Sequence, residues 1–115
     1  MKYSVDKQNK YAVFSLEEDN LNSSIAPTLK TEFIYLSNEG VQNLILDLSK
    51  VSYVDSSGLS AILTANRLWK GQDGFVLTGI VQPNVVKLIE ISRLDTVLSI
   101  SDSVEAAVKI VNDRS

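Results

Sequence analysis

Residues 44–59 read LILDLSKVSYVDSSGL, and this stretch decides the fold. It opens on a short, nearly continuous apolar run, Leu44–Leu48, which is typical of a central strand buried on both faces of a sheet. It closes on a polar loop, Asp55–Gly58, and the residues that follow place apolar side chains at helical spacing. The stretch therefore predicts a buried strand followed by a crossover helix.

The residues before this stretch predict a β-hairpin and a helix. Residues 2–17 contain two strand-forming runs on either side of a polar turn at 8–10. Residues 23–38 repeat apolar side chains at helical spacing, with Ser23 and Ser24 as candidate N-caps. We expect the hairpin to lead into this helix through an acidic, Asn-rich loop.

The residues after the stretch alternate between helix and strand. The expected strands are 75–78 and 96–100, and the expected helices are 57–70, one that starts at Pro83 and one that is capped by Asp102. Strands that alternate with helices favour right-handed crossovers and parallel pairing. The prediction is an α/β fold: a mixed, mostly parallel β-sheet with an N-terminal hairpin and about four helices.

Composition narrows the class of protein. The chain has 115 residues, of which 44% are hydrophobic and 22% charged, so we expect a single globular domain over residues 1–115. It contains no Cys and no His, which excludes a Ser-His-Asp triad, a thiolate nucleophile and the usual zinc ligands. We therefore expect a protein that is not an enzyme and that uses no metal and no cofactor.

Charge and hydropathy narrow the class of partner. The formal net charge is −3, which argues against direct binding to nucleic acid. No stretch reaches the length of a membrane span, and the first residues hold no apolar run of signal-peptide length. We expect a cytoplasmic protein with no membrane span. The sequence makes no prediction of oligomeric state.

The Asp55–Gly58 loop has a structural and a functional interpretation. Structurally, Asp55 or Ser56 caps the helix by accepting a backbone N–H bond, while Gly58 relieves crowding in its first turn. Functionally, a serine at this exposed position is open to phosphorylation, which adds about −1.5 to −2 charge beside Asp55. The two interpretations are compatible, since a capping loop can also carry a phosphosite.

The same loop resembles the signature of STAS-domain anti-sigma factor antagonists. The family's core motif, Asp-Ser-Ser-Gly-Leu, is matched by Asp55, Ser56, Ser57, Gly58 and Leu59. The resemblance extends over almost the whole chain, because the hairpin, the strands and the Pro83 helix fall where the family places them. It implies a STAS-like fold, with a mixed sheet covered by four helices.

The resemblance also implies a function. The unphosphorylated protein would bind an anti-sigma factor serine kinase and so release a sigma factor. In the family, the serine directly after the aspartate is phosphorylated, which corresponds to Ser56, and the neighbouring hydroxyl of Ser57 helps to shape the loop. Phosphorylation would switch binding off, and a serine phosphatase would restore it. The expected setting is bacterial transcription regulation by partner switching.

The chain departs from the family at one position near the expected site. The family often has an acidic residue in the loop after its second strand, whereas the aligned residue here is Asn22. An amide does not repel a phosphate, so the strength of the switch is in question. The partner-binding residues expected from this arrangement are Asn22, Ser23, Ser24, Leu59, Ile62 and Arg67.

Two other functions are compatible with the sequence. One is a constitutive STAS scaffold or transport-linked binding module, in which Asp55–Gly58 only caps a helix. The other is a small-ligand sensor with a nucleotide or lipid in the same fold. The length of the chain favours the antagonist, because assembly modules more often carry further domains.

Overall fold

A computed structural model of the chain describes residues 1–114, apart from the side chain of Gln72. Within this range the main sheet has five strands in the order β1-β2-β4-β6-β7. These strands are β1 (Tyr3–Lys7), β2 (Ala12–Leu16), β4 (Leu44–Asp47), β6 (Phe75–Thr78) and β7 (Ile100–Ser101). β1 pairs with β2 antiparallel and the other pairs are parallel, which confirms the expected mixed sheet with its N-terminal hairpin.

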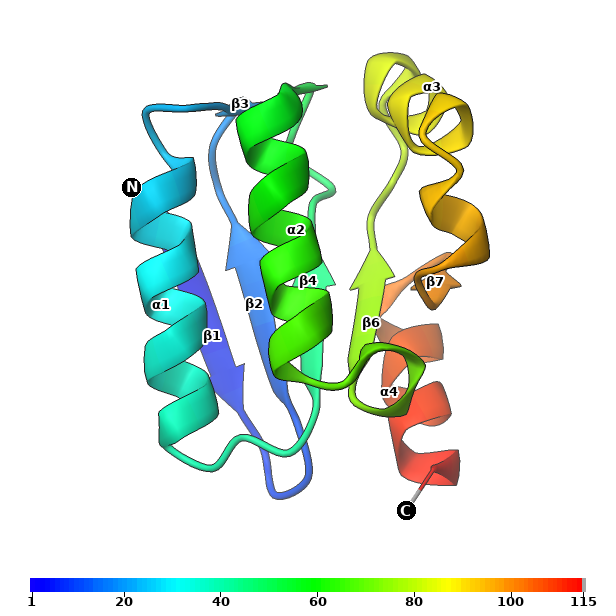
Figure 1. Ribbon diagram of the computed structural model, residues 1–115. Helices are drawn as coiled ribbons and strands as arrows, with labels where there is room; N and C mark the ends of the chain where they lie inside the picture. Colours follow the sequence, from blue (N-terminus) through cyan, green and yellow to red (C-terminus); the bar gives the residue numbers. More distant parts are fainter. Residues whose placement is uncertain (115) are drawn as a thin grey trace.

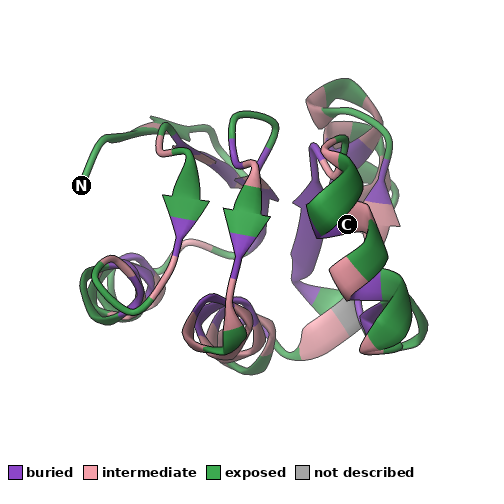
Figure 2. Cartoon of the chain, turned by 90° about the horizontal axis from the view of Figure 1, so that it is seen from above, coloured by how far each residue is buried: buried purple, intermediate pink, exposed green. Residues whose placement is uncertain are grey.

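Residues 1–114 form four α-helices, as expected, of which three lie on the faces of the sheet and the third in chain order lies beyond the C-terminal ends of the strands (Figure 1). They are α1 (Ala26–Asn38), α2 (Ser56–Leu68), α3 (Pro83–Ile91) and α4 (Val104–Asp113). α1 and α2 lie side by side on one face of the sheet, and Figure 2 shows them end-on with their buried residues toward the strands. None of the helices within residues 1–114 is long and apolar enough to cross a bilayer.

The central strands are buried on both faces, which explains their continuous apolar runs. Phe14 and Leu46 are register partners and belong to the core beneath α1 and α2. Their neighbours Val13 and Ile45 point to the opposite face, where Val111 of α4 covers them. Because alternate side chains enter two different cores, the first three residues of β2 and of β4 are all apolar, and the polar Ser15 and Asp47 occur only toward the C-terminal ends of these strands.

A second, two-stranded sheet was not predicted. β3 (Asn20–Leu21) pairs parallel with β5 (Tyr53–Val54) near the C-terminal ends of the main strands. This short pairing ties the loop after β2 to the segment that enters α2 (Figure 1). It determines which residues of the two loops become neighbours.

The strand expected over residues 96–100 is wrong for most of its length. A 3₁₀ turn occupies Leu94–Thr96, and only Ile100–Ser101 joins the sheet, as β7. Leu94 and Leu98 are both buried, and this spacing of four places them on one side of a helical turn. Burial of that pair therefore favours a turn over an extended strand.

Two of the expected helix caps are also different. α1 has Ile25 at its N-cap and no side-chain cap, so neither Ser23 nor Ser24 performs this role. α4 is capped by Ser103, whose hydroxyl accepts the backbone N–H of Ala106 at 3.1 Å, and not by Asp102. In both cases the helix begins one or two residues later than the sequence suggested.

Candidate functional site

The loops that follow β2, β5 and β6 gather at one edge of the molecule, where the parallel strands end (Figure 1). In open α/β sheets, this edge is the usual position of a functional site. The Asp55–Gly58 segment lies there, at the start of α2. Its geometry shows which of its residues caps the helix and which of its serines is exposed.

Asp55 is the N-cap of α2. Its backbone is extended, with φ −100° and ψ −173°, and its carboxylate accepts the backbone N–H of Gly58 at 2.9 Å. Its own N–H donates to the carbonyl oxygen of Leu21 in β3 at 3.2 Å. Asp55 therefore ties α2 to β3, and Ser56 is left without a capping role.

Position 58 must be glycine because the first turn of α2 packs directly against β3 and β5. A Cβ added at this position would overlap the carbonyl oxygen of Leu21. It would also lie 2.8 Å from side-chain carbons of Leu21 and Val54, well inside van der Waals contact. Glycine is therefore the residue that lets the first turn of α2 approach the small sheet.

Removal of the Asp55 cap should measurably weaken the fold. We expect Asp55→Ala to lower the free energy of unfolding by about 1 kcal/mol, because one N–H in the first turn loses its acceptor. Asp55→Asn keeps an acceptor oxygen and should lose much less. Urea denaturation of both variants measures the difference. Equal losses for the two variants would show that the charge of Asp55, and not its hydrogen bond, is what stabilises the helix.

Two hollows lie on either side of the start of α2. The first, which we call the α1–α2 cleft, has a volume of about 390 Å³ and is lined by Ser23, Ala26, Pro27, Lys30, Ser56, Ser57 and Ser60. The second, the α2–α3 groove, has a volume of about 620 Å³ and is lined by Tyr53, Val54, Asp55, Ser56, Leu59, Asn84, Lys87, Leu88 and Ile91. Ser56 belongs to both, so its side chain lies on the ridge between them.

The α2–α3 groove carries apolar side chains on an open surface. Tyr53 is 49% exposed and Ile91 is 69% exposed, and Leu59 is half-buried between them and the core. Exposed large apolar side chains that lie together, one of them aromatic, are typical of a protein-binding surface. Neither Tyr53 nor Ile91 is among the partner-binding residues predicted from the sequence. Ile91 gave one usable signal, because it lies outside the buried stripe of its helix.

The loop between β2 and α1 lies beside the start of α2, as expected. β3 pairs with β5 in a register that ends at Leu21 and Val54, the residues directly before Asn22 and Asp55. The side-chain oxygen of Asn22 accepts the backbone N–H of Ser24 at 3.0 Å, so this amide closes a local turn. Ser23 is exposed and lines the α1–α2 cleft. Of the three predicted partner-binding residues in this loop, Ser23 thus shares a cleft with Ser56, whereas Asn22 and Ser24 line a separate polar groove.

Two further predicted partner-binding residues, Ile62 and Arg67, lie further along α2. Ile62 has no exposed surface and packs in the core, so the prediction that it contacts a partner is wrong. Its helical spacing from Leu59 suggested a shared surface, but α2 buries a wide stripe that includes Ile62. Arg67 is exposed, but it lies about 16 Å from Ser56 along the helix axis at 1.5 Å per residue.

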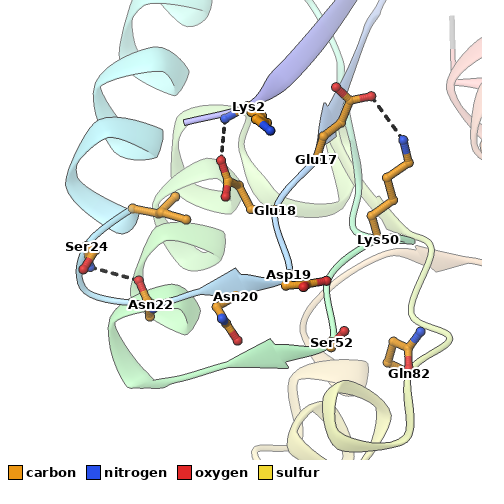
Figure 3. Close-up of a pocket in the computed structure, with 11 residues that line it drawn as sticks. Lys2, Glu17, Glu18, Asp19, Asn20, Asn22, Ser24, Lys50, Ser52 and Gln82 are labelled. Carbon is orange, nitrogen blue, oxygen red and sulfur yellow. Dashed lines mark hydrogen bonds and ion pairs between the residues drawn. The ribbon is translucent and has the colours of Figure 1, made fainter.

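A polar groove of about 750 Å³ lies next to the same loops (Figure 3). Its side chains include Glu17, which pairs with Lys50 at 3.3 Å, and Glu18, which accepts the backbone N–H of Lys2 at 2.6 Å. Asp19 adds a third carboxylate to the lining. Carboxylates outnumber lysines here, which disfavours a phosphate-bearing ligand. Within residues 1–114, no three acidic side chains converge to hold a metal ion.

Comparison with known proteins gives close agreement over nearly the full length. The chain is 27% identical over 110 residues to the anti-sigma-B factor antagonist of Bacillus subtilis, which covers 95% of this chain and 100% of that protein. The structure is similar to an anti-sigma factor antagonist from Mycobacterium paratuberculosis, with a TM-score of 0.85, 20% identity and coverage of 96% and 93% of the two chains.

A third similar structure is SpoIIAA of Bacillus in its phosphorylated form, with a TM-score of 0.70, 18% identity and coverage of 95% and 99%. The family model of the STAS domain matches residues 2–107. This range includes all five strands of the main sheet, the small sheet and the Asp55–Gly58 loop. The fold, the position of the loop and the family match agree, and the chain belongs to the STAS domain family.

Proposed function

We propose that this protein is an anti-sigma factor antagonist that binds an anti-sigma factor serine kinase and is switched off by phosphorylation of Ser56. Its similarity to the anti-sigma-B factor antagonist of Bacillus subtilis supports the class of function. One observation carries the choice of site: Ser56 is exposed on the ridge between the α1–α2 cleft and the α2–α3 groove. A charge added there faces any partner that covers either hollow.

The two neighbouring serines differ in accessibility. Ser56 is exposed, whereas Ser57 is half-buried and lines only the α1–α2 cleft. A kinase must bring the hydroxyl oxygen in line with a nucleotide phosphate, so the exposed serine is the better acceptor. The geometry thus favours the serine to which the resemblance assigned the phosphate.

The electrostatics of the ridge give the phosphate a strong effect on binding. Asp55 already places a carboxylate beside Ser56, and a phosphate there adds about −1.5 to −2 charge at neutral pH. The affected partner atoms would lie within the Debye length of about 8 Å. Covering the apolar residues of the α2–α3 groove would also remove water from the phosphate. Both effects weaken the complex.

Asn22 changes how the switch works in this chain. It directly follows Leu21, the β3 residue that pairs with Val54 just before the phosphosite loop, and its amide carries no charge. Asn22 therefore adds no repulsion of its own to a phosphate on Ser56, and the carboxylates of this loop, Glu17, Glu18 and Asp19, line the polar groove and not the two hollows beside Ser56. We propose that the phosphate acts mainly against the partner's surface and not by rearranging the antagonist.

The proposed protein acts by binding alone. It has no His and no Cys, so any phosphoryl transfer and its reversal depend on the partner kinase and a serine phosphatase. Since a kinase that inhibits a sigma factor works where transcription occurs, we place this chain in the bacterial cytoplasm. It requires no cofactor for this role.

The proposal predicts where the phosphate will be found. Incubation of the purified chain with an anti-sigma factor kinase and ATP should give one main phosphopeptide, modified on Ser56. Ser57→Ala should still be phosphorylated at a similar rate, whereas Ser56→Ala should not. Mass spectrometry of the digested protein makes the assignment. Phosphate that persists in Ser56→Ala, on Ser57 or Ser60, would refute the proposed site.

A further inference from the structure

Lys30 of α1 reaches across the α1–α2 cleft to α2. Its Nζ atom donates to the hydroxyl oxygen of Ser60 at 2.9 Å, and its side chain is half-buried. Within residues 1–114, Lys30 forms no ion pair. A half-buried ammonium group is thus held by a neutral hydroxyl, although a negatively charged acceptor would bind it about twice as strongly.

Ser60 lies one helical turn after Ser56, so the two side chains share a face of α2. Both serines and Lys30 line the α1–α2 cleft. Lys30 is the charged residue in that lining, and none of the described residues there is a carboxylate. A phosphate on Ser56 would therefore have, within one turn of the helix, a cation that no carboxylate of the cleft neutralises.

We propose that Lys30 is the residue that binds the phosphate of phosphorylated Ser56. This inference rests on the proposed function in one respect, the choice of Ser56 as the phosphosite. The ammonium group leaves the Ser60 hydroxyl and donates to a phosphate oxygen, a movement that the four-carbon stem of lysine permits. The phosphate is then held over the α1–α2 cleft, and its dianionic form is stabilised at neutral pH.

The other charged groups near Ser56, Asp55 and Lys87, line the α2–α3 groove and not the α1–α2 cleft. Asp55 lies on the side of the α2–α3 groove and would raise the second pKa of the phosphate, because its carboxylate repels the dianion. Lys87 of α3 is exposed and lines the same groove. It provides a matched control, since it is a lysine near Ser56 on the other side of α2 and lacks a hydrogen bond to that helix.

The test uses the full chain with phosphoserine incorporated at position 56 during translation, so that no kinase is needed. The second pKa of the phosphate is read from a ³¹P NMR titration. We expect it to lie about 0.5 below the ordinary value of about 6 in the otherwise unchanged protein. Lys30→Met should return it to the ordinary value or above, while Lys87→Met should leave it nearly unchanged.

Two further variants separate charge from packing. Lys30→Arg should keep the lowered pKa, and Lys30→Gln, which keeps a hydrogen-bond donor but has no charge, should abolish it. Equal pKa values in the Lys30→Gln variant and in the otherwise unchanged protein, or a larger change in Lys87→Met, would overturn the inference. Because no kinase is used, this failure would leave the mapping of the phosphosite intact. A failed mapping would equally leave the titration readable.

Discussion

Replacing Gly58 with alanine is expected to destabilise the protein by about 1–3 kcal/mol, the usual cost of overpacking a closed site. The new methyl group would overlap the backbone carbonyl of Leu21, which a change of side-chain rotamer cannot relieve. Alanine is the better helix former by about 1 kcal/mol, so the collision must exceed that gain to produce a net loss. We expect it to do so, because β3 is also held by its pairing with β5.

Ser57→Ala is the matched control for this variant. It changes the neighbouring residue in the same turn, removes atoms instead of adding them and should alter stability by less than about 0.5 kcal/mol. Thermal unfolding of both variants, followed by circular dichroism, gives the comparison. Gly58→Ala should melt several degrees below wild type. An unchanged or raised melting temperature would show that β3 and α2 can separate without cost.

Ser56→Ala and Ser56→Asp are expected to differ strongly in binding while remaining equally folded. Asp55 provides the helix cap, so neither change should shift the free energy of unfolding by more than about 0.5 kcal/mol. Ser56→Ala should bind the kinase partner as tightly as the unmodified protein and stay bound in the presence of ATP. Ser56→Asp should bind about tenfold more weakly, because like charges brought together at an interface are unfavourable.

Aspartate is an incomplete substitute for the phosphate. It carries one charge and two oxygens, whereas phosphoserine carries nearly two charges and three oxygens. Its carboxylate is also too short to extend over the α1–α2 cleft as a phosphate would. Ser60→Asp is a useful control, because it places the same charge one turn further along α2 and beside Lys30. If both variants weaken binding equally, the effect is one of general charge and not of the ridge position.

The sequence predicted the parts of the site that depend on local chemistry. An acidic residue before a helix is a strong N-cap, and Asp55 adopts that geometry. The apolar run from Leu44 indicated a strand with two covered faces, and Leu44, Ile45 and Leu46 are all fully buried. The cap and the buried strand each depend on a few adjacent residues, so they can be recognised directly from the sequence.

The parts that were missed depend on contacts between distant segments. β3 and β5 are too short to show an alternating pattern, yet their pairing explains why position 58 must be glycine. Ile62 shares the helical spacing of Leu59, but packing from several sides buries one and half-exposes the other. Lys30 belongs to no sequence motif. It became a candidate only when α1 was found packed against α2.

We expect charge on Ser56 to control whether the partner kinase can bind. The most direct test is calorimetric titration of that kinase with the unmodified chain and with the chain fully phosphorylated on Ser56. We expect phosphorylation to raise Kd about 100-fold or more, since several kcal/mol of repulsion and desolvation are placed at the interface. The same Kd for both forms would contradict the account and leave Asp55–Gly58 as a helix cap alone.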